Sequence, residues 1–273
     1  MRQVQISNFS VGGNQRFTLI AGPCVIESED LIFSVAEELK RITDDLGIHF
    51  IFKSSFDKAN RSSISSPRGV GIEQGLRILQ RVKETYNLPI LTDVHESWQC
   101  AIVAEVADVL QIPAFLSRQT DLLMAAAQTG RVVNIKKGQF MAPWDMKQVI
   151  AKCVDAGNDQ LLLCERGTSF GYNNLVVDMR GLVDMRSYGY PVVFDATHSV
   201  QKPSINGTTT GGDRRYVPYL MNAALSIGVD AIFAEVHPCP EKAWSDAANQ
   251  LKLSDVRPII THAIAVDSLT KNL

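Results

Sequence analysis

The stretch His49-Phe-Ile-Phe-Lys-Ser-Ser-Phe-Asp-Lys-Ala-Asn-Arg-Ser-Ser63 decides how the rest of the chain is interpreted. A short apolar run ends at Phe52, and cations and serines follow it with few apolar residues between them. A buried strand that ends in this way delivers ammonium, guanidinium and hydroxyl donors to one place, and such donors suit phosphate or carboxylate oxygens. A Lys- and Ser-rich segment can also be an ordinary solvated loop. The functional interpretation is favoured because other strands of the chain end in the same way.

Strands and helices alternate on both sides of this stretch. Near-continuous apolar runs, typical of strands buried on both faces, recur roughly every 30 residues, which is the length of a βα unit. The sequence predicts these strands at 17–21, 49–53, 89–93, 109–112, 132–136, 160–164, 192–195 and 231–235. It predicts helices near 31–46, with Asp30 as a possible N-cap, and near 72–86, 98–107, 120–128, 144–155, 175–187, 217–227, 242–251 and 256–269.

This alternation predicts an α/β fold, a single (β/α)8 barrel of the TIM type over residues 1–273. Val4-Gln-Ile-Ser and Arg16-Phe-Thr-Leu-Ile20 flank Gly12-Gly-Asn14, so residues 1–16 are predicted to form an N-terminal β-hairpin that runs into the first long strand. An open doubly wound sheet is the alternative. Such a sheet usually has fewer strands and a glycine-rich first turn, and the chain has no G-x-G-x-x-G motif.

Composition excludes several classes of protein. The net charge of −2 gives no basic surface for nucleic acid, and the hydrophobic content of 45% is ordinary for a globular core. No apolar run could span a bilayer and no signal peptide precedes the first strand, so we expect a cytoplasmic protein without a membrane partner. The five cysteines are scattered, which argues against a disulfide framework or a zinc ribbon. Cys100, Cys153 and Cys164 are predicted to lie in the core.

Polar residues gather at the predicted strand ends, where a (β/α)8 barrel holds its active site. These residues are Cys24, Lys53, Asp93, His95, Gln111, Lys136, Lys137, Glu165, Arg166, Asp195, His198, Glu235 and His237. One charged strand end is usually a solvated edge. Charged, amide or thiol groups at nearly all of them indicate a functional site.

The strand-end residues fall into two chemical groups. The cations Lys53, Lys58, Arg61, Lys136 and Arg166 exceed what one phosphate monoester needs, and they suit two anionic groups. Cys24, His198 and Glu235 come from the first, seventh and eighth strands, which are neighbours once a barrel closes, and Asp246 could join them. A thiolate, an imidazole and carboxylates are ligands for Zn²⁺, Fe²⁺ or Mn²⁺. Each member alone could also be a core thiol, a structural histidine or a helix cap.

These same residues resemble the 3-deoxy-D-manno-octulosonate 8-phosphate synthase family. The resemblance covers about residues 17–253 and is carried by Ala21-Gly-Pro-Cys-Val-Ile-Glu-Ser28, Phe52-Lys-Ser-Ser-Phe-Asp-Lys-Ala-Asn-Arg-Ser-Ser63, Thr92-Asp-Val-His-Glu-Ser97, Gln111-Ile-Pro-Ala-Phe115, Asn134-Ile-Lys-Lys-Gly-Gln139, Cys164-Glu-Arg-Gly-Thr168, Phe170-Gly-Tyr-Asn-Asn174 and Asp195-Ala-Thr-His-Ser-Val-Gln201. The K-A-N-R-S run is the most specific piece. The sister family, 3-deoxy-D-arabino-heptulosonate 7-phosphate synthase, carries K-P-R-T-S in its place. The loop 199–215 departs most from the family pattern.

The resemblance implies an activity and a set of roles. The family condenses phosphoenolpyruvate with D-arabinose 5-phosphate and releases phosphate, as a tetrameric barrel enzyme of lipopolysaccharide synthesis. Its metal-dependent class carries a cysteine where the other class has asparagine, and Cys24 stands at that position. The implied metal ligands are Cys24, His198, Glu235 and Asp246. The implied phosphoenolpyruvate contacts are Lys53, Ser55, Lys58, Lys136 and Arg166, with Gln111 and Asp93 nearby, and the implied pentose phosphate contacts are Asn60 and Arg61. Catalytic roles fall to Lys136, Asp93, His198 and Cys24, with Lys136 as the hypothetical general acid.

Three other functions are compatible with parts of this pattern. A heptulosonate synthase would use erythrose 4-phosphate, and the K-A-N-R-S run argues against it. A metal-dependent barrel hydrolase of phosphorylated sugars would not need so many cations. A non-catalytic sugar-phosphate sensor would not need an intact set of metal ligands.

Overall fold

Eight parallel strands form a closed barrel in the computed structural model, which describes residues 1–203 and 211–272. The barrel strands are β3 (Thr18–Gly22), β4 (Phe50–Lys53), β5 (Ile90–Asp93), β6 (Val109–Ile112), β7 (Val132–Lys136), β8 (Leu161–Glu165), β11 (Val192–Asp195) and β14 (Ala231–His237). Each strand pairs with the next along the chain, and the pairing of β11 with β14 and of β14 with β3 closes the circle. The predicted (β/α)8 barrel is therefore confirmed, and the open sheet is wrong.

The strands are buried on both faces, as their apolar runs predict. Every residue of β3 and of β8 is buried, for example. One set of side chains points into the barrel and packs as a closed core that includes Ile20, Leu91 and Phe233. The alternate set, including Leu19 and Phe52, packs outward against the helices. Side chains therefore fill the barrel, and the chemistry has to lie at one of its ends.

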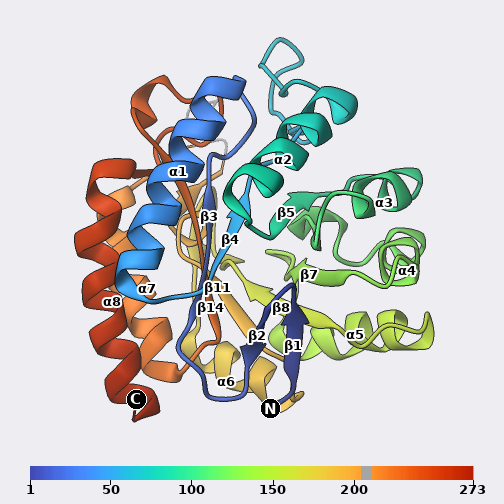
Figure 1. Ribbon diagram of the computed structural model, residues 1–273. Coiled ribbons are helices and arrows are strands. Elements are labelled where there is room, and N and C mark those ends of the chain that lie inside the picture. The colour runs from blue at the N-terminus through green and yellow to red at the C-terminus, as the bar shows by residue number, and fades with distance from the viewer. Residues whose placement is uncertain (204–210, 273) are drawn as a thin grey trace.

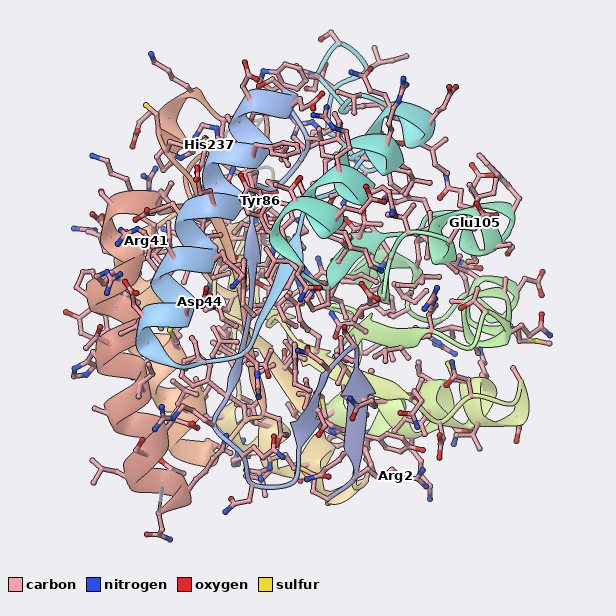
Figure 2. The ribbon with its side chains drawn as sticks, in the orientation of Figure 1. Arg2, Arg41, Asp44, Tyr86, Glu105 and His237 are labelled. Atoms are coloured by element: carbon pink, nitrogen blue, oxygen red, sulfur yellow. The ribbon has the colours of Figure 1, made fainter. Side chains whose placement is uncertain are left out.

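Helices surround the barrel (Figure 1). They are α1 (Glu29–Leu46), α2 (Ile72–Tyr86), α3 (Ser97–Ala104), α4 (Thr120–Gln128), α5 (Met146–Asp155), α6 (Met179–Ser187), α7 (Val217–Ile227) and α8 (Val256–Lys271). Their outer faces carry charged side chains, as Arg41 and Asp44 of α1 show (Figure 2). None of the helices in the described part of the chain is both long and apolar enough to cross a bilayer.

Local capping explains why some helices begin where they do. Helix α1 begins two residues earlier than predicted because Ser28, and not Asp30, is its N-cap, and Ser28 Oγ accepts from the backbone N–H of Leu31. Helix α6 begins at Met179 because Asp178 caps it. The preceding residues Leu175–Val176 (β10), predicted as helix, instead pair with Thr168–Ser169 (β9). The prediction of a helical start at 175 is thus wrong.

The predicted helix over 242–251 is wrong. This segment contains a short turn, Pro240–Lys242, then an irregular loop, and then the short strand β15 (Leu251–Lys252), which pairs with β14. Asp246 has a φ of 52°, a left-handed conformation that a right-handed helix does not tolerate. The alternation of alanines, Trp244 and Leu251 imitates a helical pattern, but the polar side chains of the loop face inward.

The N-terminal hairpin closes one end of the barrel. It consists of β1 (Gln3–Ile6) and β2 (Phe9–Gly12), so its turn lies at Ser7 and Asn8 and not at the predicted Gly12-Gly-Asn14. Val4, Ile6 and Val11 are buried and join the interior core of the barrel. Figure 1 shows the hairpin at the end opposite to the loops that follow β3 and β4. The carboxyl ends of the strands therefore lie at the other end, which is open to ligands.

Candidate active site

A cavity of about 380 Å³ lies at the carboxyl ends of the strands. Nine of the thirteen residues to which the resemblance gives a role line it, and the strand-end residue His95 also lines it. The nine are Lys58, Asn60, Arg61, Asp93, Gln111, Lys136, Arg166, His198 and Asp246. The other four of the thirteen are buried beneath or beside the cavity, each at most 1% exposed: Cys24, Lys53, Ser55 and Glu235. The structure thus brings the two predicted chemical groups to one end of the barrel.

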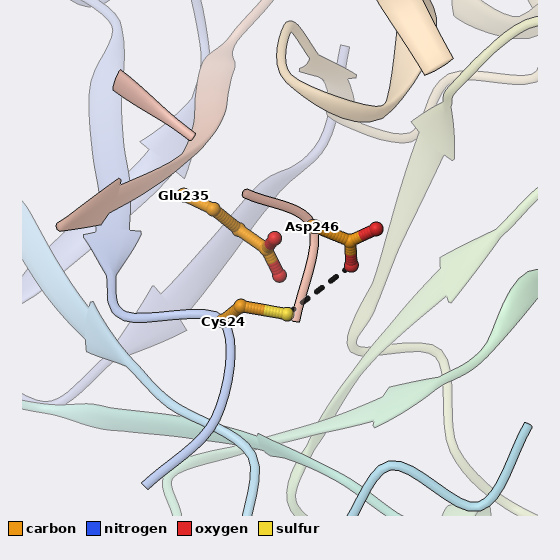
Figure 3. Close-up of side chains that lie close together, drawn as sticks. All are labelled: Cys24, Glu235 and Asp246. Carbon is orange, nitrogen blue, oxygen red and sulfur yellow. Dashed lines mark hydrogen bonds between the residues drawn. The ribbon is translucent and has the colours of Figure 1, made fainter. Parts of the chain in front are cut away.

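Three of the predicted metal ligands form a tight cluster (Figure 3). One ligand atom each from Cys24, Glu235 and Asp246 lies within 4.8 Å of the others. Cys24 follows β3, Glu235 lies in β14, and Asp246 comes from the irregular loop before β15. The Cys24 Sγ lies 3.2 Å from Asp246 Oδ2. The left-handed conformation at Asp246 is part of the loop geometry that brings this carboxylate over the thiol.

Gly22 allows the strands beneath the cluster to approach each other. In the β3–β14 register Gly22 pairs with Glu235. A Cβ on Gly22 would lie 2.0 Å from the carbonyl oxygen of Lys53 in β4, which is far inside contact distance. A residue with a side chain would therefore push β3 and β4 apart just before Cys24.

His198 lies beside this cluster. It opens the short turn His198–Val200 after β11. Its Nε2 is 3.6 Å from Glu235 Oε2 and 3.8 Å from Asp246 Oδ2. Its Nδ1 is 2.7 Å from Asp195 Oδ2. A carboxylate on one ring nitrogen of a histidine is the arrangement that leaves the other nitrogen free to bind a metal.

The charges of the cluster fit a cation. Burial raises the pKa of the Cys24 thiol, and the neighbouring Glu235 carboxylate raises it further. Burial also raises the pKa of Glu235, but Lys53, His198 and Lys58 lower it by more, to about 2. The thiol is therefore protonated until something positive replaces its proton, while the carboxylate stays charged. A divalent ion satisfies both groups at once, since metal binding releases the thiol proton.

An unpartnered atom supports the same conclusion. Glu235 Oε1 accepts from Lys53, but Glu235 Oε2 is buried and has no hydrogen-bond donor among residues 1–203 and 211–272. A buried carboxylate oxygen without a partner is costly. Because Oε2 faces the His198 ring, a cation bound by Cys24, His198, Glu235 and Asp246 would satisfy it. The residues present thus fit a divalent metal of the Zn²⁺, Fe²⁺ or Mn²⁺ type.

Lys53 lies under the cluster and not in the cavity wall. Its ammonium is 0% exposed and donates to Glu235 Oε1 at 2.8 Å and to the carbonyl oxygen of Cys24 at 2.9 Å. It therefore holds two of the candidate ligands in place. Lys58 reaches the same carboxylate from the cavity side, with its Nζ 3.6 Å from Glu235 Oε1.

A chain of hydrogen bonds fixes Asp93 at the cavity floor. Asn134 donates to Gln111 Oε1 at 2.8 Å, Gln111 donates to one oxygen of Asp93, and Ser55 donates to the other. Burial raises the pKa of Asp93, but Lys58 and Lys53 outweigh it and hold the pKa well below its usual range. Asp93 is thus a fixed, charged acceptor, and Ser55 acts through it from below.

Lys136 occupies the centre of the cavity wall. Its Nζ lies 2.6 Å from Asp195 Oδ2 and 3.9 Å from the centre of the Phe233 ring. Burial lowers the pKa of Lys136, but Asp195 and other acidic groups raise it by more, so the pKa is above its usual value. Lys136 therefore carries a proton and points it at the space between Asp195 and His198.

Arg166 presents an unused donor. Its Nη2 donates to Gln201 Oε1 at 2.6 Å, while Nη1 is buried and has no partner in the described part of the chain. Burial lowers the pKa of Arg166, and Asp195 and Asp246 oppose this effect. A buried guanidinium nitrogen without an acceptor, at the wall of a cavity, is suited to an anionic ligand.

Arg61 and Asn60 lie at the outer rim. Arg61 Nη1 donates to Ser245 Oγ at 2.5 Å and Nη2 donates to the carbonyl oxygen of Trp244 at 2.8 Å. Asn60 is exposed. The loop 57–70 is thereby joined to the loop that carries Asp246. The segment 204–210, which contains most of the departure from the family pattern, lies outside the described residues.

Several residues matter that the sequence did not assign a role. Asp195 bridges Lys136 and His198, and Gln201 bridges Arg166 and Asp246. Gln250 accepts from the Cys24 N–H and donates to the carbonyl oxygen of Ser245. A charged strand end indicated Asp195, but no local pattern marks the two glutamines, because their partners lie far away in sequence. Cys100, Cys153 and Cys164 are at most 1% exposed, as predicted for core thiols.

Comparison with known proteins agrees with this geometry. The model of the DAHP synthetase I family matches residues 2–271. The 2-dehydro-3-deoxyphosphooctonate aldolase of Fusobacterium nucleatum is 59% identical over 273 residues, which are 100% of this chain and 98% of that protein. Proteins of the same name from Cyanothece sp. and Dichelobacter nodosus are each 58% identical, over 97% and 98% of this chain and 98% and 97% of theirs.

These findings confirm the predicted resemblance and favour the octulosonate enzymes over the heptulosonate alternative. They also show that the chain is an enzyme, which excludes the sensor. The chain belongs to the DAHP synthetase I family and groups there with enzymes named 2-dehydro-3-deoxyphosphooctonate aldolase.

Proposed function

We propose that the protein condenses phosphoenolpyruvate with D-arabinose 5-phosphate and water to give 3-deoxy-D-manno-octulosonate 8-phosphate and phosphate, for lipopolysaccharide synthesis. One observation carries this proposal. Lys58, Arg61, Lys136 and Arg166 converge on a single cavity beside a cluster of a thiol and two carboxylates. Two anionic substrates that must meet in one place need this many cations. The names of the relatives support the same reaction.

Phosphoenolpyruvate would lie in the inner part of the cavity. The unpartnered Nη1 of Arg166 and the ammonium groups of Lys136 and Lys58 would bind its phosphate and carboxylate. Gln111 and Asp93 are close to these cations and would limit the orientations of the bound substrate. Lys53 and Ser55 would act from beneath, because neither lines the cavity.

Arabinose 5-phosphate would enter from the rim. Asn60 and Arg61 would hold its phosphate, which places the aldehyde carbon toward Lys136 and the carboxylate cluster. Arg61 would exchange its bonds to Trp244 and Ser245 for bonds to the phosphate. Holding both substrates in line contributes through effective molarity.

A divalent ion would be held by Cys24, His198, Glu235 and Asp246. When bound, such an ion supplies Lewis-acid chemistry, either to the aldehyde oxygen or to the attacking water. Zn²⁺, Fe²⁺ and Mn²⁺ suit this mixed donor set. Lys53 would keep Glu235 charged and oriented, and Asp195 would keep Nε2 of His198 available.

The chain's own residues would carry the remaining steps. Carbon 3 of phosphoenolpyruvate attacks the aldehyde carbon, and Lys136 gives a proton to the oxygen that becomes a hydroxyl. Water adds at carbon 2 and releases a proton that restores Lys136. Phosphate then leaves by cleavage of its bond to carbon 2, the new hydroxyl becomes the keto group, and its proton leaves with the phosphate. Asp195 lies 2.6 Å from Lys136 and would position the ammonium for this transfer. Arg166 would stabilise the charge on the departing phosphate.

A substrate exchange tests the proposal. Phosphate release from phosphoenolpyruvate should require arabinose 5-phosphate, and mass spectrometry should find one eight-carbon product. Turnover of phosphoenolpyruvate with erythrose 4-phosphate but not with arabinose 5-phosphate would make the enzyme a heptulosonate synthase. Phosphate release without any aldehyde would support a hydrolase.

We also propose a homotetramer in the cytoplasm. Phe115, Phe140 and Trp144 are large apolar side chains at least 55% exposed in the segments that follow β6 and β7, and such exposure is typical of surfaces that bind another chain. Sedimentation equilibrium should give four times the 30.1 kDa mass of the chain. A species of monomer mass would contradict the tetramer.

A further inference from the structure

Gln201 lies between the two halves of the candidate site. It follows the turn His198–Val200 and begins β12 (Gln201–Lys202), which pairs with β13 (Gly211–Gly212). Its side chain borders the cavity and is almost fully buried. A polar amide in such a position needs partners on both ends.

The two partners of Gln201 come from opposite sides of the site. Its Oε1 accepts from Arg166 Nη2 at 2.6 Å, and its Nε2 donates to Asp246 Oδ1 at 2.7 Å. A guanidinium offers only donors and a carboxylate only acceptors, so these partners fix the orientation of the amide. Glutamate would place a second carboxylate against Asp246, and lysine would place a cation against Arg166. Glutamine satisfies both groups without adding charge.

The bridge also determines which atom of Asp246 faces the candidate metal ligands and which atom of Arg166 is left for an anion. With Oδ1 of Asp246 bound to Gln201, Oδ2 faces Cys24 Sγ at 3.2 Å and His198 Nε2 at 3.8 Å. With Nη2 of Arg166 bound, Nη1 is the buried donor that has no partner in the described residues. The amide of Gln201 thus turns one oxygen of Asp246 toward the other candidate metal ligands. It leaves one guanidinium nitrogen of Arg166 for an anion.

We propose that Gln201 is a positioning residue that couples anion binding at Arg166 to cation binding at the candidate metal ligands Cys24, His198, Glu235 and Asp246. An anion on Arg166 Nη1 holds the guanidinium in place, the guanidinium holds the amide, and the amide holds Asp246 in its ligating position. A cation at Asp246 acts in the reverse direction, since coupling between two sites is reciprocal. This inference rests on the proposed function for the identity of the two ligands, a divalent cation and phosphoenolpyruvate.

The test measures binding without turnover. The affinity for Co²⁺, followed by the thiolate-to-cobalt absorption band of Cys24, is determined with and without phosphoenolpyruvate and in the absence of any aldehyde. We expect phosphoenolpyruvate to tighten Co²⁺ binding to the unaltered enzyme by about fivefold or more. Gln201→Met has a side chain of similar length that cannot form either hydrogen bond. The ratio of Co²⁺ affinities with and without phosphoenolpyruvate should therefore fall to about one. Gln201→Asn keeps the amide but is one methylene shorter, so it should also lose the coupling.

A control and three outcomes make the result decisive. Gln160→Met is the same substitution at the other end of the barrel, where the side chain bonds to Asp159 alone among the described residues, and it should keep the full enhancement of Co²⁺ affinity. Coupling that persists in both Gln201 variants overturns the inference alone, as does an unaltered enzyme that binds both ligands independently. An unaltered enzyme that binds no Co²⁺ or no phosphoenolpyruvate overturns the proposed function as well. Unchanged circular dichroism in either Gln201 variant shows that the loss is not unfolding.

Discussion

At the scale of single residues, Asp195 organises the catalytic side of the cavity. One of its oxygens lies 2.6 Å from Lys136 and 2.7 Å from Nδ1 of His198. Burial alone would raise the pKa of Asp195, but His198 and Lys136 lower it well below its usual range. A permanently charged carboxylate thus keeps the lysine protonated and the imidazole oriented.

Lys136→Met should abolish most of the activity. The variant lacks the proton donor and one cation, and loss of a general acid typically costs about 100- to 10,000-fold in kcat. Steady-state kinetics with both substrates measures the loss. Lys147→Met, at an exposed position on α5, is the matched control and should keep normal kcat. If Lys136→Met kept more than about a tenth of the activity, Lys136 would not be the proton donor.

Asp230, at the closed end of the barrel, makes the stability of the fold depend on pH. Its side chain is 2% exposed, and burial raises its pKa above 3.8 although the Val192 N–H and Arg186 oppose the shift. The folded protein therefore holds this proton more tightly than the unfolded chain. Stability from this group is highest below the unfolded pKa and is lost as the pH rises through the folded pKa.

Asp230→Asn should therefore be at least as stable as the unaltered protein near pH 7. Asparagine can still accept from the Val192 N–H, and the advantage should shrink as the pH falls and the Asp230 carboxylate takes up its proton. Urea unfolding measured at pH 7 and at a series of lower pH values checks this. Asp184→Asn, an exposed site on α6, should show no such difference. A variant that is less stable at every pH would mean that the Asp230 carboxylate is needed.

The sequence predicted the chemistry of single residues better than their contacts. The strand-end pattern placed Lys136, Arg166 and His198 at one end of the barrel, because that follows from topology alone. It did not separate Lys53, which lies under Glu235, from Lys58, which faces the cavity. Two lysines five positions apart have the same chemistry, and only the path of the loop decides which one reaches the ligand.

At the scale of elements, the junction of β3, β4 and β14 holds the candidate metal ligands together. Gly22→Ala should disturb it, because the new Cβ would lie 2.0 Å from the Lys53 carbonyl oxygen. We expect a loss of about 1–3 kcal/mol in the free energy of unfolding, as is typical of overpacking. We also expect weaker Co²⁺ binding, since Cys24 follows two residues later. Urea unfolding and metal titration check both, and unchanged values would show that the strands adapt freely.

The sequence predicted elements well where packing repeats and poorly where side chains override the pattern. Strands β6, β7 and β11 and helices α2, α4 and α7 have the predicted bounds. The segment 242–251 has helical spacing of its apolar residues, yet it forms a loop. Arg61 and Gln250 bind its backbone carbonyls, and Asp246 adopts a left-handed φ. The Arg61 contact joins distant parts of the chain, so the local hydrophobic pattern does not contain it.

At the scale of the whole molecule, the barrel has one structural end and one chemical end. The hairpin fills the first, and Ile6 is 1% exposed within the interior core. Ile6→Ala should lower the free energy of unfolding by about 2–5 kcal/mol, as in other buried truncations. The kcat should change little, because the site lies at the opposite end. Ile102→Ala, on the exposed face of α3, is the control and should cost far less. Equal losses of stability at both positions would contradict the packing of the hairpin into the barrel interior.

The candidate metal ligands lie at the chemical end of the barrel. Cys24, His198, Glu235 and Asp246 come from four separate segments. The buried Glu235 Oε2 has no hydrogen-bond donor among residues 1–203 and 211–272, and a divalent ion at this place would satisfy it. The most direct measurement is phosphate release from phosphoenolpyruvate and arabinose 5-phosphate before and after treatment with a strong chelator. We predict that chelation abolishes activity, that Mn²⁺, Zn²⁺ or Fe²⁺ restores it, and that Cys24→Ala cannot be restored. Full activity in chelated enzyme or in metal-free Cys24→Ala would contradict the account.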